Sequence, residues 1–184
     1  MKKSIGIVNF YGNKIPEILI KILSELCDNV IVISHKSDYM NIIKDSCIKN
    51  WIFSESNLNP NSENTPKIDI EKIAKIKGKN FLLIGYSMQK ALLQKKYTLK
   101  TTSKKKYKIT TNNESLFSDI DDKMDIVKKN NHFFDVETND LKEINIKSTY
   151  NNMLMIAKYK KILMTDFCPE HSEDGMQLLE NWIK

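Results

Sequence analysis

Four consecutive residues, Cys168, Pro169, Glu170 and His171, bring a thiol, a carboxylate and an imidazole together in the sequence. A cysteine that a neighbouring histidine deprotonates can act as a nucleophile. The backbone need not turn the ring of His171 toward the sulfur of Cys168, so this pairing is kept as an alternative. A metal site that adds His132 to this group is a second alternative, but the spacing matches no recognised zinc motif. We therefore expect no metal ion and no cofactor.

An apolar run that turns sharply into a helical stretch forms a second candidate site. It reads Phe81-Leu82-Leu83-Ile84-Gly85-Tyr86-Ser87-Met88-Gln89. Ser87 is a candidate nucleophile here, but no histidine accompanies it in the sequence, so we expect it to pack in a helix. Gly85 stands at the bend, where a residue without a side chain accepts strained backbone angles easily.

This run and the segment Asp166-Phe167-Cys168-Pro169-Glu170 together resemble the class I glutamine amidotransferases. In that family the nucleophile turn reads roughly Gly-Ile-Cys-Tyr-Gly-Met-Gln, and the acid-base turn reads Phe-His-Pro-Glu. The resemblance implies that Gly85 stands in place of the nucleophilic cysteine and that Cys168 stands in place of the histidine base. Glu170, which orients the histidine in the family, is retained.

Neither replacement keeps the family's chemistry. Glycine has no side chain that could attack a carbonyl carbon. A thiol, with an ordinary pKa of about 8.5, is a poor proton shuttle at neutral pH. The positions Gly85, Cys168 and Glu170 are therefore interpreted as a vestigial catalytic site.

A third part of the family's machinery also differs. After its third strand the family carries Ser-Gly-Gly-Pro, whose glycine amide helps to bind the oxyanion. The matching stretch here is Phe53-Ser54-Glu55-Ser56-Asn57-Leu58-Asn59-Pro60, without glycine. The resemblance implies that Glu55 places a carboxylate where negative charge would develop, which is the opposite of oxyanion stabilisation. Three missing parts together predict a pseudoenzyme.

The resemblance also marks positions of the family's substrate pocket, which we interpret as vestigial: Glu55, Ser87, Gln89 and His132. Ser87 replaces a family glycine, and Gln89 matches a glutamine that lines the site. His132 lies in Asn130-Asn131-His132-Phe133, which is similar to a segment that closes the glutamine pocket, although His132 could equally be a loop residue bonded to backbone. The Tyr-Ser-Met-Gln stretch is similar to the GMP synthetase amidotransferase subunit, and Asn-His-Phe to the carbamoyl-phosphate synthetase type.

The composition fits a globular protein. The 184 residues are 41% apolar, and we expect a single domain over residues 1–184. No run approaches the roughly 18 to 20 apolar residues that cross a bilayer, and the start has no secretory cleavage site, so we expect a cytoplasmic protein. The three cysteines are expected to be free thiols.

The net charge is +6, and every basic residue is lysine. The lack of arginine argues against nucleic-acid recognition, which relies on the guanidinium group. The lysine-rich segment 90–108 is therefore expected to be mainly a solvated surface, although contact with phosphates or an acidic partner protein is an alternative.

The first half alternates strand and helix signals, which predicts a mainly parallel sheet. Strands are expected at 4–9, 30–34, 50–54 and 80–84, and helices at 15–26, 39–45 and 69–76. Asn13 is placed to cap the first helix, and Pro16 is tolerated in its first turn. A polar loop is expected at 55–66.

The second half has short strand-like runs at 97–111, 125–128, 134–137, 143–149, 153–159 and 161–167, which predict antiparallel additions to the sheet. A helix from about Glu173 should close the chain, with Met176, Leu179 and Ile183 on its apolar face. With the resemblance, the pattern predicts a flavodoxin-like α/β three-layer sandwich with a central, mainly parallel sheet and an antiparallel extension.

We therefore expect a catalytically degenerate, glutamine amidotransferase-like protein that acts as a non-catalytic binding or regulatory module. Its partner would be a synthetase or another protein subunit, and glutamine binding is doubtful. The alternative is a residual amidotransferase or hydrolase, with Cys168 as its nucleophile. Active members of the family release ammonia from glutamine through a cysteinyl thioester and deliver it to a synthetase.

Overall fold

The computed structural model describes residues 3–112 and 114–184 of the chain. Its first half alternates strands and helices as predicted. The elements are β1 (Ser4–Asn9), α1 (Glu17–Leu26), β2 (Asn29–Ser34), α2 (Tyr39–Asp45), β3 (Asn50–Phe53), α3 (Ile70–Lys75), β4 (Asn80–Ile84) and α4 (Tyr86–Leu93).

The second half consists mainly of strands and ends in a helix. Its elements are β5 (Leu99–Thr101), β6 (Lys106–Thr110), the 3-10 turn η1 (Ser115–Phe117), β7 (Lys123–Val127), β8 (His132–Phe134), β9 (Asn145–Tyr150), β10 (Met153–Tyr159), β11 (Ile162–Thr165), the 3-10 turn η2 (Pro169–His171) and α5 (Glu173–Ile183).

A seven-stranded sheet in the order β2-β1-β3-β4-β11-β10-β9 forms the centre of the molecule. The first five strands of this order run parallel, and β10 and β9 extend the sheet in antiparallel fashion. Two further antiparallel pairs, β5 with β8 and β6 with β7, stand apart from the main sheet. The predicted antiparallel additions are therefore confirmed, with four of the six strands outside the parallel core pairing in small ribbons. The run at 161–167 was wrongly placed among them, because β11 pairs parallel with β4 and so completes the parallel part of the sheet.

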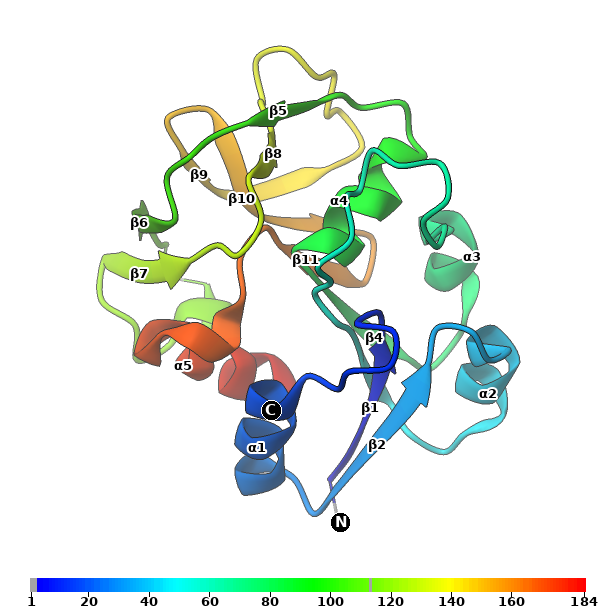
Figure 1. Ribbon diagram of the computed structural model, residues 1–184. Helices are drawn as coiled ribbons and strands as arrows, with labels where there is room; N and C mark the ends of the chain where they lie inside the picture. Colours follow the sequence, from blue (N-terminus) through cyan, green and yellow to red (C-terminus); the bar gives the residue numbers. More distant parts are fainter. Residues whose placement is uncertain (1–2, 113) are drawn as a thin grey trace.

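Helices cover both faces of the sheet (Figure 1). On one face, α2, α3 and α4 bury side chains such as Ile43, Ile73 and Leu92 against the strands. On the other face, α1 and α5 bury Leu23 and Leu179 together with the ribbon formed by β6 and β7. Two separate apolar clusters on opposite faces give the α/β three-layer sandwich of flavodoxin-like type that the sequence predicts.

The first helix departs from the prediction. It begins at Glu17 rather than Ile15, and its N-cap position is Pro16, which has no side chain to bond the first amides. Asn13 therefore does not cap this helix. Ile15 and Ile18, both counted in the predicted apolar face, are 55% and 50% exposed. The buried face of α1 is narrower than expected and consists of Leu19 and Leu23.

The closing helix begins at Glu173 as predicted, with Ser172 accepting a hydrogen bond from the amide of Gly175 as its N-cap. Leu179 and Ile183 are buried as expected, but Leu178 occupies the core and Met176 is only half-buried. Within residues 3–112 and 114–184, no helix combines the length and apolar content needed to cross a bilayer.

Parallel pairing places the candidate residues at one edge of the sheet. Phe53 of β3 pairs with Leu83 of β4, and Ile84 of β4 pairs with Thr165 of β11. The carboxyl ends of these three neighbouring strands therefore meet, next to the point where the chain order reverses between β1 and β3. Open α/β sheets hold their ligands at such a switch point.

Candidate functional site

The bend between β4 and α4 keeps a strained geometry at Gly85. Its φ of 48° and ψ of −107° lie where residues with side chains are rarely found. Its amide donates to the carbonyl of Thr165 at 2.7 Å, and its carbonyl accepts from the amide of Gln89 at 2.9 Å. The bend is therefore held from both sides, by β11 and by the first turn of α4.

The carboxylate of Glu55 fills the space beside this bend. A Cβ atom built on Gly85 would lie 1.7 Å from Oε2 of Glu55, far inside van der Waals contact. The space that a side chain at position 85 would need is thus taken by an atom from the loop after β3. Glu55 itself is almost completely buried, with 1% of its surface exposed.

Two backbone amides converge on the other oxygen of this carboxylate. Oε1 of Glu55 accepts from the amide of Ser56 at 2.8 Å and from the amide of Tyr86 at 2.7 Å. Tyr86 opens α4, so the helix dipole also favours an anion here. One amide directly after a strand-to-helix bend and one from a neighbouring loop is the donor arrangement of an oxyanion hole. In this protein the two amides donate to the side chain of Glu55, which belongs to the same chain.

Asn130 also contacts Glu55, although it was not singled out in the sequence as a site residue. Its Nδ2 donates to Oε2 of Glu55 at 3.0 Å, while its Oδ1 accepts from Nε2 of Gln89 at 2.8 Å and from the amide of His132 at 3.2 Å. Its proximity to His132 in the sequence was the available signal. Asn130 therefore links the Glu55 carboxylate to a second buried network.

That second network centres on a buried ion pair between Lys128 and Asp166, both with fully buried side chains. The ammonium of Lys128 also donates to the carbonyl of Asp166 at 2.7 Å and to that of His132 at 3.0 Å. Gln89 donates to Oδ1 of Asp166 at 2.5 Å. Sequence reasoning gave no hint of Lys128, because lysine is almost always exposed and this chain is rich in it.

The residues that the resemblance marks therefore separate into two groups. Glu55 and Gly85 lie against each other, whereas Gln89 and the backbone of His132 belong to the internal network around Asp166. Ser87 is buried, and its hydroxyl donates to the carbonyl of Ser54 at 2.6 Å, in agreement with the expected packing role.

The turn after β11 brings Cys168 to the same place. Its thiol lies 3.8 Å from Oε2 of Glu55 and donates to it. Burial raises the pKa of Cys168 well above its ordinary value, and the carboxylates of Glu55 and Glu170 add to this rise. A buried thiol that faces carboxylates stays protonated, so it is a weak nucleophile.

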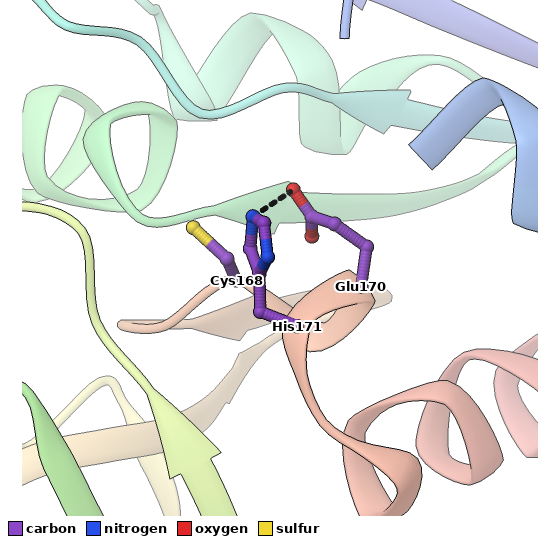
Figure 2. Close-up of side chains that lie close together, drawn as sticks. All are labelled: Cys168, Glu170 and His171. Carbon is purple, nitrogen blue, oxygen red and sulfur yellow. Dashed lines mark ion pairs between the residues drawn. The ribbon is translucent and has the colours of Figure 1, made fainter. Parts of the chain in front are cut away.

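Glu170 and His171 lie beside this thiol (Figure 2). Nε2 of His171 is 3.9 Å from Oε1 of Glu170, and one potential ligand atom from each of the three side chains lies within 4.8 Å of the others. Burial, followed by the charge of Lys129, lowers the pKa of His171, so the imidazole is neutral at pH 7. His132 is not part of this group, which differs from the four-residue alternative considered in the sequence.

Burial also changes the acidity of Glu55 and predicts a pH-dependent stability. It raises the pKa of Glu55 to about 7 against the opposing effects of the Ser56 and Tyr86 amides and of Lys128. Between the unfolded pKa of about 4.5 and about 7, the folded state keeps a proton that the unfolded state has lost, so stability falls as pH rises. The loss should reach about 3 kcal/mol.

Urea unfolding of the wild type and of Glu55→Gln at pH 5 and pH 8 measures this effect. Glutamine keeps an oxygen for the two amides but does not ionise, so the variant should gain stability relative to the wild type as pH rises. Glu63→Gln is the control, because its side chain is exposed. Parallel pH profiles for wild type and Glu55→Gln would contradict the burial of an ionisable carboxylate at this place.

Comparison with known proteins identifies the fold but no closer relationship. Neither a protein-family model nor a curated protein sequence matches this chain. A candidate GMP synthase subunit from Thermoplasma acidophilum superposes with a TM-score of 0.73 at 14% identity, covering 100% of this chain and 93% of the other. The chain has a glutamine amidotransferase-like fold.

A second solved structure agrees with this assignment. A glutamine amidotransferase from Thermotoga maritima superposes with a TM-score of 0.67 at 12% identity, and the match covers 97% of this chain and 81% of the other. At such low identity the likeness concerns the fold. The glutamine amidotransferase-like fold expected from the two short motifs is therefore confirmed, while the roles of individual residues rest on the geometry described above.

Proposed function

We propose that this protein is a catalytically degenerate, glutamine amidotransferase-like protein that acts as a binding or regulatory module. The occupation of its vestigial site by Glu55 carries the proposal. Its carboxylate accepts from both converging amides and lies where a nucleophile at position 85 would project. A substrate carbonyl therefore finds neither a nucleophile nor a free pair of donors.

A docking role on a synthetase is supported by the surface next to the vestigial site. A groove of about 640 Å³ contains Ile15, Ile18 and Glu170 in its lining. Both isoleucines are at least half exposed. Apolar side chains in the open beside a polar site are typical of an interaction surface. The likeness to a candidate GMP synthase subunit suggests that the partner is the synthetase subunit that consumes ammonia.

A coupled glutamate assay tests the loss of catalysis. The purified protein, alone and with the ammonia-consuming GMP synthetase subunit of its own organism, should release no glutamate from glutamine above the background without protein. The thiol of Cys168 supplies the competing hypothesis, because it lies in the same cluster as His171. Turnover that disappears in Cys168→Ala would overturn the proposal and establish a hydrolase.

Titration calorimetry with the same synthetase subunit tests the docking role. Ile18→Glu should weaken binding at least about tenfold, because it places a charge in the apolar surface. Ile31→Glu is the matched control, because Ile31 is also exposed, at 46%, but lies on β2 and does not line the groove. Lack of binding by the wild type, or equal weakening by both variants, would contradict docking through this surface.

A further inference from the structure

The turn from Cys168 to His171 presents three different ligand types to one point. One potential ligand atom from each of Cys168, Glu170 and His171 lies within 4.8 Å of the other two (Figure 2). Thiolate sulfur, imidazole nitrogen and carboxylate oxygen are the donors that Zn²⁺ takes in proteins. A hard ion such as Mg²⁺ would avoid the thiolate.

Unmade hydrogen bonds at the same place are a second, independent observation. Oε2 of Glu170 and Nε2 of His171 are buried and have no hydrogen-bond partner among the described residues. Only 4% of the Glu170 side chain is exposed. A buried polar atom without a partner costs about 1 to 3 kcal/mol, so an unpartnered oxygen and an unpartnered nitrogen on adjacent residues of one turn indicate that a ligand binds there.

We propose that Cys168, Glu170 and His171 bind one divalent ion of the zinc class. The three side chains leave one position of a tetrahedral site open for water or another ligand. Binding would replace the proton of the Cys168 thiol by the metal and release that proton to solvent. The ion would also supply the partners that Glu170 and His171 lack.

The backbone around the three ligands is held in place before any ion binds. The amide of Cys168 donates to the carbonyl of Val127 at 3.1 Å, and the amide of His171 donates to the carbonyl of Cys168 at 3.1 Å. Helix α5 packs closely on the turn, since a Cβ atom on Gly175 would lie 2.2 Å from the carbonyl oxygen of Pro169. A preorganised turn lowers the entropic cost of binding.

The positive charge of Lys129 opposes the ion and provides a test of its position. The ammonium of Lys129 acts electrostatically on all three ligands and lines the groove that reaches Glu170. Removing this positive charge should therefore tighten binding about threefold to tenfold. Lys142 is the matched control, because its side chain is 86% exposed and lies outside the groove.

Titration of the full chain with Co²⁺ tests the proposal, because a cobalt–thiolate bond produces a charge-transfer band in the near ultraviolet. We expect one equivalent of Co²⁺ to bind and to produce this band. Zn²⁺ should then displace the bound Co²⁺. Cys168→Ser should lose the band and bind more than about tenfold more weakly. Cys47→Ser should keep the band and the wild-type affinity for Co²⁺, because Cys47 is an exposed free thiol elsewhere in the chain. Lys129→Gln should bind Co²⁺ more tightly than the wild type, and Lys142→Gln should bind Co²⁺ with the wild-type affinity.

His171→Gln provides a second route should Cys168→Ser fail to fold, which circular dichroism would reveal. The His171→Gln variant should keep the cobalt–thiolate band but bind Co²⁺ more than about tenfold more weakly than the wild type. The proposal is overturned if wild type shows no band and no Zn²⁺ binding by calorimetry, or if the band disappears with Cys47→Ser. Neither result depends on glutamine turnover, so the metal site and the proposed loss of catalysis are tested separately.

Discussion

Replacing Gly85 by alanine is expected to destabilise the protein by about 2 to 6 kcal/mol. Two effects add. The backbone at φ 48° is strained for any residue with a side chain, which costs about 1 to 3 kcal/mol. The new Cβ would also lie 1.7 Å from Oε2 of Glu55. Such overpacking costs a further amount of about 1 to 3 kcal/mol. Urea unfolding measures the sum.

Gly78→Ala separates the two effects. Gly78 has a φ of 69°, and a Cβ atom placed there meets nothing within 4 Å, so this variant bears the strain without the clash. In the double variant Glu55→Ala/Gly85→Ala the clash is gone, and the destabilisation should be smaller than the sum of the single effects by about 1 to 3 kcal/mol. Equal costs for Gly85→Ala and Gly78→Ala would show that no carboxylate fills the bend.

The carboxylate of Glu55 also affects what a side chain at position 85 could do in catalysis. Gly85→Cys by itself should not restore a nucleophile, because the cysteine Cβ would meet Glu55 just as an alanine Cβ does. The two amides would also remain bonded to the carboxylate. Positions 55 and 85 would therefore have to change together before the absence of a base at position 168 limits catalysis.

Lys128→Met should cost about 3 to 5 kcal/mol, since it leaves the carboxylate of Asp166 buried without its cation. Burial already raises the pKa of Asp166 to about 6, against the opposing charge of Lys128. Without that charge, Asp166 should take up a proton more easily. The destabilisation, measured by urea unfolding, should therefore be larger at pH 8 than at pH 5.

Two comparisons make this result specific to the buried pair. Lys128→Met/Asp166→Asn removes both charges and should recover at least about half of the lost stability. Lys108→Met breaks an exposed pair with Asp125, whose side chains are 57% and 66% exposed, and should change stability by less than about 1 kcal/mol. A similar small effect for Lys128→Met would refute the structural role assigned to the pair.

Internal contacts thus stabilise the candidate site and fill the space beside the bend at Gly85. Glu55 bonds the two amides, and Asn130 connects it to the network of Gln89, Lys128 and Asp166. Hydrogen-bonded buried polar groups hold one arrangement rigidly, although Oε1 of Gln89 has no partner among the described residues. This rigidity suits a protein that presents a fixed surface better than one that opens for a substrate.

Much of the fold could be predicted from local pattern. The ranges of β1, α2, β4 and β10 follow directly from apolar runs and their flanking polar residues, and the alternation of the first half indicates a parallel sheet. The start of α1 was less predictable, because Ile15 continues the helical spacing although the chain turns there. Periodicity alone does not reveal that Pro16 takes the N-cap position.

The sequence by itself determined that position 85 has no side chain and that position 168 carries a thiol. It also placed a carboxylate in the loop after β3. Only the tertiary structure decided that this carboxylate occupies the bend, because Glu55 is 31 residues from Tyr86 and 75 from Asn130. The register of β3, β4 and β11 brings these atoms together, and register depends on packing across the whole sheet. The burial of Lys128 against Asp166 was decided in the same way.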